Sequence, residues 1–438
     1  SMASLASEES LNPGVQRREV FAWAMYDFAN SGYTTVVLTA VFSAYFAGAV
    51  AGKADWGPLA WSAALSVSYA LVMLTMPGLG AWADERAKKK PLLMMVTAGC
   101  VVSTAALGGV QPGDVWLAVV LIIASNLFFS YGESVSAAFL PELARADALG
   151  RVSGWGWSFG YLGGMLALGL SLAYVIWAQG QGQPAAMFVP VTMLITAAIY
   201  GLASLVTFRW LRERPPPIRR ADGDKGLRAA LRQLRGTFRQ LRHYPDFAWL
   251  LACATAYQGG VAVAITLAAI YAEQVIGFQQ QETMVLIFVL NIAAALGAFA
   301  FGYLQDLLGH KRTLAITLIA WAATCFLAAA TTTKAGFWWA AAIAGISMGS
   351  SQSCGRALAG LLAPPRQLAE FYGLWTFATR LASIIGPLAY GLITWGTGGN
   401  QRLAIASTAA LFVIGLVLLI PIQIERGRAA ALADPSDA

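Results

Sequence analysis

Twelve long stretches of predominantly apolar residues constrain the fold of this chain more than any other feature of its 438 residues. About 20 apolar residues in a helix are enough to cross the hydrocarbon core of a bilayer. The stretches show little of the alternation that a membrane β-barrel requires, and charged residues make up only 12% of the chain, about half the share of a soluble protein. We therefore predict an all-α membrane protein with twelve transmembrane helices. They lie, within a few residues, at 21–47, 59–83, 91–110, 115–139, 152–178, 187–210, 246–272, 283–305, 312–332, 336–362, 371–395 and 402–424.

Lysine and arginine concentrate in alternate loops between these stretches. With twelve spans and the N-terminus inside, 24 of the 29 basic residues fall on the cytoplasmic side, whereas Lys53, Lys334 and Arg402 fall outside. Cytoplasmic loops carry such an excess, and an odd number of spans would destroy it. We therefore expect both termini to be cytoplasmic. Short loops and a composition rich in Ala, Gly and Arg favour a bacterial inner (plasma) membrane.

A basic amphipathic helix is predicted in the middle of the chain, where Leu227, Leu231, Leu234, Phe238 and Leu241 alternate with arginines. Such a helix suits an anionic inner leaflet, so we expect membrane lipids, and no nucleic acid, as partners of residues 227–242. The expected regions are an N-terminal cytoplasmic tail (1–20), an N-terminal six-helix bundle (21–211), a cytoplasmic linker with the basic helix (212–245), a C-terminal six-helix bundle (246–424) and a C-terminal cytoplasmic tail (425–438).

Two loops share one pattern at a separation of 222 residues. Gly80 and Asp84 recur as Gly302 and Asp306, and both pairs precede basic residues. A glycine lets neighbouring helices approach, and Asp84 can accept hydrogen bonds at a helix N-terminus. The repeat therefore indicates a duplication of six spans.

The doubled Gly-x-x-x-Asp loop resembles the signature of the major facilitator superfamily, and the resemblance extends over the whole chain. It implies two pseudo-symmetric six-helix bundles, the major facilitator fold, in which helices 1, 4, 7 and 10 line a central cavity. It also implies that the two loops latch one half against the other as the protein changes state. Ala87 stands where the family has a glycine. The expected latch residues are Gly80, Asp84, Arg86, Lys88, Gly302, Asp306, Lys311 and Arg312.

A narrower resemblance rests on three segments, Tyr26-Asp-Phe-Ala-Asn-Ser31, Leu140-Pro-Glu-Leu143 and the glycine-rich run from Arg151 to Gly164. Together they resemble the autophagy-related vacuolar amino-acid effluxers of fungi and their bacterial relatives. The fungal members imply amino-acid export from the vacuole, and this substrate extends to the bacterial branch only by analogy.

Four ionisable residues, Asp27, Glu133, Arg356 and Arg380, lie within the predicted spans. Each costs about 2.5–3.5 kcal/mol at a helix centre, so we expect them to pair or to face a wet cavity. Two interpretations of Glu133 and Arg356 stay open: they form the core of a site for a zwitterion, or they pair with each other and close the cytoplasmic mouth. Proton coupling is expected to act through Asp27 or Glu133; the alternative for Asp27 is that it caps or anchors helix 1 near the cytoplasmic surface.

Polar side chains recur on one face of the helices expected to line the cavity. The resulting candidates for substrate binding or coupling are Asp27, Asn30, Tyr33, Asn126, Glu133, Tyr257, Gln258, Gln352, Arg356 and Arg380. We interpret Trp155, Trp157 and Trp375 as packing residues rather than ligand contacts, and Trp23 as a member of the interfacial tryptophan belt.

These features predict a secondary active transporter that moves a small polar or zwitterionic solute, an amino acid or small peptide, by alternating access. We expect efflux, proton coupling and a monomer, with sodium coupling left open. A lipid or lysolipid translocator, or a sugar or muropeptide permease of the same fold, are the alternatives. The chain carries no nucleotide-binding motif and no Ser/His/Asp, paired-acid or metal constellation, so we expect neither an enzyme nor a metal or cofactor beyond an ion gradient.

Overall fold

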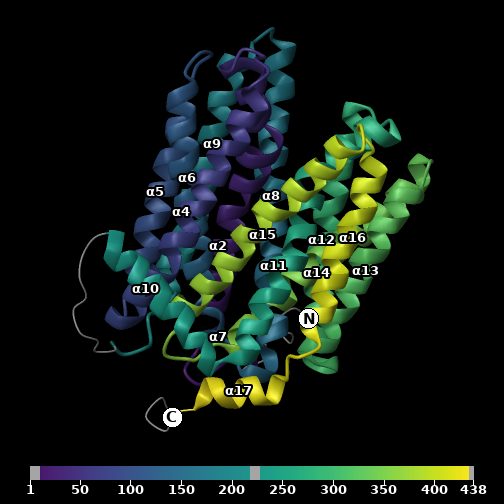
Figure 1. Cartoon of the computed structure of the whole chain (residues 1–438). Helices are drawn as coiled ribbons and strands as arrows, with labels where there is room; N and C mark the ends of the chain where they lie inside the picture. Colours follow the sequence, from purple (N-terminus) through teal and green to yellow (C-terminus); the bar gives the residue numbers. More distant parts are fainter. Residues whose placement is uncertain (1–9, 218–226, 434–438) are drawn as a thin grey trace.

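The computed structural model describes residues 10–217 and 227–433, which form a bundle of long helices (Figure 1). The first rod consists of α2 (Arg17–Gly32), η2 (Tyr33–Ala40), α3 (Phe42–Tyr45) and η3 (Phe46–Val50). The other long helices of this N half are α4 (Gly57–Arg86), α5 (Lys89–Leu107), α6 (Val115–Ala137), α8 (Leu149–Gly180) and α9 (Ala185–Trp210). Between α6 and α8 lie the short segments α7 (Leu140–Leu143) and η4 (Ala146–Ala148).

The C half repeats this plan after α10 (Leu227–Gln240) and η5 (Leu241–His243). Its long helices are α11 (Pro245–Tyr271, continued by η6, Ala272–Ile276), α12 (Gln280–Leu308), α13 (His310–Ala330), α14 (Lys334–Leu362), α15 (Leu368–Gly396) and α16 (Gln401–Leu419). The short helix α17 (Ile424–Leu432) follows. The observed helices coincide with the twelve predicted stretches to within a few residues at most ends.

Eleven rods of the described chain are long and apolar enough to cross a membrane. The twelfth, α14, has 29 residues but is less apolar than the others, because it carries Ser347, Ser350, Ser351, Gln352, Ser353 and Arg356. It packs against α8, α12 and α13, and these serines are buried, so neighbouring helices rather than lipid surround its polar face. A transmembrane helix tolerates polar residues in such a position.

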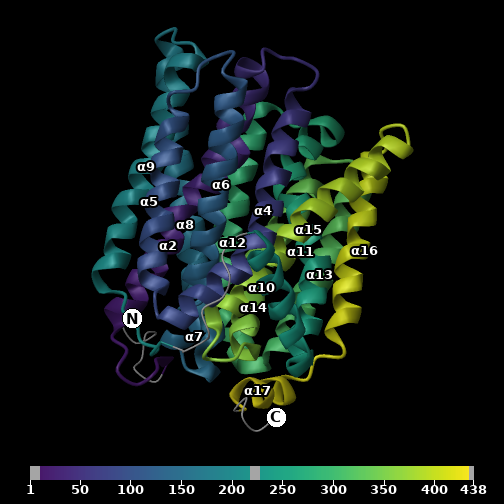
Figure 2. The ribbon, with the colours of Figure 1, turned by 60° about the vertical axis from the view of Figure 1, so that its left-hand side comes forward.

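The described ends of the chain and the helices α10 and α17 lie at the same end of the bundle, which we call the linker face (Figure 2). Ser10 accepts a hydrogen bond from Arg145, and Asp246 at the start of α11 binds Arg426 of α17. The common position of both ends agrees with an even number of spans. Towards the opposite, distal face the helices of the two halves diverge (Figure 1).

The two halves contact each other through α4 with α15 and through α8 with α12. Glycines make both contacts close: a Cβ atom at Gly80 would collide with the carbonyl of Ala369, and one at Gly302 would meet the carbonyl of Gly150 at 2.7 Å. The hydrogen bonds that join the halves within the described chain lie between the linker face and Arg380. Arg380 is twelve residues into α15, or about 18 Å along it. The halves are therefore bonded to each other on the linker side.

Ala87 ends α4 in the left-handed region, with φ 53° and ψ 46°. A residue with a Cβ atom costs about 1–2 kcal/mol in this conformation, and a glycine avoids that cost. Glycine also gives the unfolded chain more conformational freedom, which cancels part of the gain in stability. We expect Ala87→Gly to stabilise the protein by about 0.5–1 kcal/mol, measured as a higher melting temperature in detergent. The matched control is Gly309→Ala at the second loop, where φ is 99° and ψ is 153°; it should lower the melting temperature. A lower melting temperature for Ala87→Gly would contradict the left-handed backbone conformation at position 87.

Candidate functional site

Arg356 of α14 and Asp27 of α2 form an ion pair between the halves, with 2.8 Å between Nη1 and Oδ2. The guanidinium also donates to Ser153 of α8, through Nη2 to the carbonyl (2.8 Å) and through Nε to the hydroxyl (3.2 Å). It lies over the rings of Trp23 and Trp157, at 4.7 and 5.3 Å from their centroids. The side chains of Arg356 and Asp27 are only 7% and 12% exposed. This pair is therefore sealed inside the protein.

The space for this pair comes from Gly156 of α8. A Cβ atom at Gly156 would approach Arg356 Nη2 to 2.6 Å and Asp27 Oδ2 to 2.7 Å, closer than such contacts allow. Ion pairs in a low-dielectric interior are favourable only when the remaining donors and acceptors are satisfied. The glycine and the serine at position 153 together supply that environment.

Arg380 of α15 and Glu133 of α6 form the second pair between the halves, with 3.0 Å between Nη2 and Oε1. Arg380 also donates to Ser130 Oγ (3.1 Å) and to Thr379 Oγ1 (3.3 Å). Its side chain is 11% exposed, whereas that of Glu133 is 37% exposed. The second pair is therefore accessible through its carboxylate.

Of the two interpretations left open for Glu133 and Arg356, the one in which they pair with each other is wrong for this structure. The repeat relates these two positions in sequence, but Arg356 turns towards α2 and α8, and Glu133 turns towards α15. All four intramembrane charges are nevertheless compensated, as their cost in hydrocarbon requires.

The other candidates from the sequence bond within the C half or within the N half, and among the described residues none of their side-chain hydrogen bonds joins the two halves. Gln258 and Gln352 meet inside the C half, where Nε2 donates to Oε1 at 2.8 Å. Tyr33 donates to or accepts from Ser125 at 2.6 Å, and Asn126 donates to Ser68 at 3.0 Å, both within the N half. Like Tyr257, these two side chains have at most 1% exposed surface, and Asn30 is also buried. In this conformation they pack inside their own half.

The structure adds residues that the sequence did not single out. Tyr161 of α8 packs against Trp157, which covers Arg356, with 5.7 Å between the ring centroids. Trp23 is fully buried and donates to the carbonyl of Ser136, so its assignment to the interfacial belt is wrong. Its place near the end of a span resembles a belt position, but its ring faces inward to cover Arg356.

The two signature aspartates cap helices of the opposite half. Asp84 accepts hydrogen bonds from the backbone N–H groups of Ala369 (3.1 Å) and Glu370 (2.8 Å) at the start of α15. Asp306 accepts from those of Gly150 and Arg151 at the start of α8, both at 2.9 Å. A carboxylate is favourable at a helix N-terminus, as the sequence predicted for Asp84.

The basic residues of the two loops have different partners. Arg86 lies over Trp82, Lys311 donates to the carbonyls of Ile420 and Ile422, and Lys88 and Arg312 are exposed. Within the described chain these four therefore do not form the bonds between the halves.

The linker helix α10 packs against α4 and contacts the start of α15. Thr237 donates to Glu370 Oε2 at 2.7 Å, and Gln367 donates to Gln240 at 2.7 Å. Glu370 is the residue whose backbone N–H binds Asp84. The helix expected to lie on a lipid surface thus also contacts the junction of the halves.

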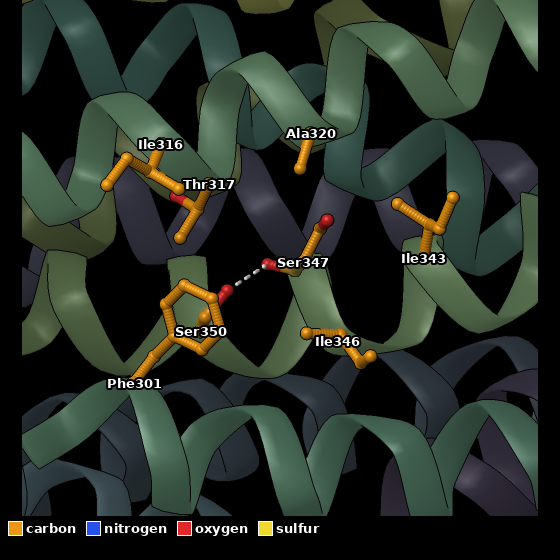
Figure 3. Close-up of a pocket in the computed structure, with 8 residues that line it drawn as sticks. All are labelled: Phe301, Ile316, Thr317, Ala320, Ile343, Ile346, Ser347 and Ser350. Atoms are coloured by element: carbon orange, nitrogen blue, oxygen red, sulfur yellow. Dashed lines mark hydrogen bonds between the residues drawn. The ribbon is translucent and has the colours of Figure 1, made fainter. Parts of the chain in front are cut away.

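A small cavity of about 90 Å³ lies between α12, α13 and α14, away from both charge pairs (Figure 3). Its polar groups are the hydroxyls of Thr317, Ser347 and Ser350; those of Thr317 and Ser350 donate to the backbone carbonyls of Leu314 and Ser347. It carries no charge that could recognise an ionic solute.

Comparison with known proteins identifies the family. Residues 61–432 match the family described as vacuole effluxer Atg22 like. The chain belongs to this Atg22-like family. YxiO of Bacillus subtilis, an uncharacterised MFS-type transporter, is 29% identical over 412 residues, which cover 91% of this chain and 93% of that protein. Autophagy-related protein 22-1 of Aspergillus fumigatus is 26% identical over 308 residues, 65% of this chain and 49% of the fungal protein.

The chain spans about half the length of the fungal relatives that it matches. Among solved structures, the human organic anion transporter MFSD10 superposes with a TM-score of 0.73 at 18% identity and covers 92% of this chain and 99% of that one. The transporter FucP in its outward conformation gives 0.69 at 12% identity, with 93% and 100% covered. These likenesses confirm the major facilitator fold. The chain is an integral membrane protein and an MFS-type transporter.

The two ion pairs should differ in their contribution to stability. We expect Asp27→Asn to lower the free energy of unfolding by about 3–5 kcal/mol, because it leaves the buried Arg356 charge without its partner. Glu133→Gln should lower it by less, because the side chain of Glu133 is 37% exposed whereas that of Asp27 is 12% exposed, although Arg380 also loses its partner. Denaturant unfolding of the purified variants measures both. Adding Arg356→Gln to Asp27→Asn should recover part of the loss, and equal costs for the two single variants would contradict the difference in burial.

Proposed function

We propose that this member of the Atg22-like family exports a small zwitterionic solute, an amino acid or small peptide, by proton-coupled alternating access. The proposal places the linker face in the cytoplasm of a bacterial plasma membrane, since most basic residues flank that face. The charged side chains of both signs in the two ion pairs between the halves support the substrate class.

The difference in exposure between the two ion pairs carries the proposal. Glu133 and Arg380 would receive the substrate, with its ammonium at Glu133 and its carboxylate at Arg380. A zwitterion that inserts between them replaces each charge contact by another and leaves no charge unpaired in a low dielectric. A solute with one charge would leave either Glu133 or Arg380 without compensation. The site would therefore select for paired charges.

The sealed pair would act as a gate. While Asp27 holds Arg356, the ends of α2, α8 and α14 on the linker side remain bonded to one another. Opening of the linker face requires this bond to break, together with the helix caps at Asp84 and Asp306. In this scheme Glu133 belongs to the substrate site and Arg356 to the gate, whereas the sequence alone left both roles open for each residue.

Proton coupling would act on a carboxylate of these pairs. A proton on Asp27 removes the negative charge that holds Arg356, so it weakens the gate. A proton on Glu133 takes the place of the substrate ammonium, so proton and substrate exchange at that carboxylate. Either step links a proton to one conformation. If transport in vesicles follows an imposed sodium gradient and ignores a pH gradient, sodium is the coupling ion instead.

Ligand binding by the purified protein tests the substrate class. A zwitterionic amino acid should raise the melting temperature in proportion to the logarithm of its concentration, whereas the matching amine and the matching carboxylic acid should not. Arg380→Gln should weaken binding by about 10- to 100-fold, because a hydrogen bond to a charged group contributes about 1.5–3 kcal/mol.

The gate variant supplies the control. Asp27→Asn should keep binding within about threefold of the parent and lose the coupling of transport to the pH gradient in vesicles. If Asp27→Asn abolishes binding and Arg380→Gln leaves it intact, the roles assigned to the two pairs are reversed and the proposal fails. Stabilisation by lysolipids with no response to zwitterions would favour a lipid translocator.

A further inference from the structure

A groove of about 510 Å³ runs along the outer surface of α13 and α16 and ends at the linker face. Its walls are apolar and come mainly from α16, including Val413, Leu416, Val417 and Ile420. Lys311 and Arg312, in the first turn of α13, close its end. One end of the groove is therefore cationic, and the rest faces the hydrocarbon.

The two cations differ in the number of hydrogen bonds that they donate to the described chain. Lys311 donates to the carbonyls of Ile420 and Ile422 at 2.7 and 2.8 Å, and no carboxylate of the described residues pairs with its charge. Arg312 is exposed, and its guanidinium binds no group of the described chain. The residues that line the groove include no acid. The carboxylate of Asp246, which binds Gln423 just beyond α16, is already paired with Arg426.

The N half has an equivalent helix start, at α5, and there a carboxylate compensates the positive charge. By the separation of 222 residues between the two loops, Lys89 and Lys90 correspond to Lys311 and Arg312. There the carboxylate of Glu213 accepts hydrogen bonds from the backbone N–H groups of Lys89 (2.9 Å) and Lys90 (2.7 Å) at the start of α5. The N half thus places an anion of its own at this helix N-terminus.

In the part of the C half that the structure describes, no carboxylate binds the start of α13. Glu213 lies three residues after the end of α9, and Ile422 occupies the equivalent position three residues after the end of α16. Ile422 is apolar and fully buried. The start of α13 therefore combines the positive end of a helix with two cations, and among the described residues it lacks the carboxylate that compensates the same arrangement in the other half.

We propose that this groove binds an anionic phospholipid of the surrounding leaflet. Its phosphate takes the place that Glu213 occupies in the N half, at Arg312, Lys311 and the first turn of α13. One acyl chain lies along Val413, Leu416 and Val417. The head group supplies the anion and the groove supplies the apolar contact, so a lipid satisfies both parts of the site, and free phosphate satisfies only one.

Native mass spectrometry of the purified full chain tests this site. With equal amounts of palmitoyl-oleoyl phosphatidylglycerol and phosphatidylcholine added to the detergent, the protein should retain phosphatidylglycerol. Arg312→Gln should reduce that retention about fivefold or more, as expected for one cation at a membrane surface. Val417→Trp fills the groove at an exposed position and should reduce retention without any change of charge.

Lys90→Gln is the matched control. It removes a cation at the equivalent place of the N half, where Glu213 already provides the anion, and should leave retention unchanged. Inorganic phosphate in excess should not displace the lipid. Equal retention of the two lipids, equal losses in Arg312→Gln and Lys90→Gln, or displacement by inorganic phosphate would each overturn the proposal.

Discussion

The ion pair between Asp27 and Arg356 is the interaction on which the linker side of this transporter depends. Two opposite charges inside a membrane protein require each other, because either alone is costly in hydrocarbon. Since Asp27 belongs to the first span and Arg356 to the tenth, that requirement holds the two halves together. Ser153 extends the bond to the fifth span, and the rings of Trp23 and Trp157 cover the guanidinium. The contact between the halves is strong while both residues are charged. It weakens when either Asp27 or Arg356 loses its charge.

The helix caps surround this ion pair but are not equivalent. At the start of α8, Arg151 adds an ion pair to Asp306, with Nε 2.8 Å from Oδ2. At the start of α15, the neighbour of Asp84 is Glu370, a like charge. Thr237 of the linker helix donates to Glu370, so α10 offsets part of this unfavourable arrangement. The duplication therefore gave the two junctions the same backbone geometry with different electrostatics.

Much of the architecture could be predicted from the sequence, because it depends on local properties. Apolar length located the spans, and the doubled Gly-x-x-x-Asp loop placed Asp84 at a helix N-terminus. The partners of the intramembrane charges could not be predicted, because they depend on how each helix is rotated about its own axis and therefore on which neighbour each side chain faces. That rotation is set by close contacts such as the one at Gly156, which leaves room for Arg356 beside Asp27. For the same reason a tryptophan near a span end, Trp23, was placed in the lipid interface although it covers the buried pair.

The distance between the halves at the linker face tests the central claim most directly. Spin labels on cysteines introduced at Ala146 and Leu307, one exposed position in each half, report this separation by double electron–electron resonance; the four native cysteines are buried. The account predicts one short distance in the parent protein and a second, longer population in Asp27→Asn. The same distance distribution in both proteins would contradict a gate held by Asp27 and Arg356.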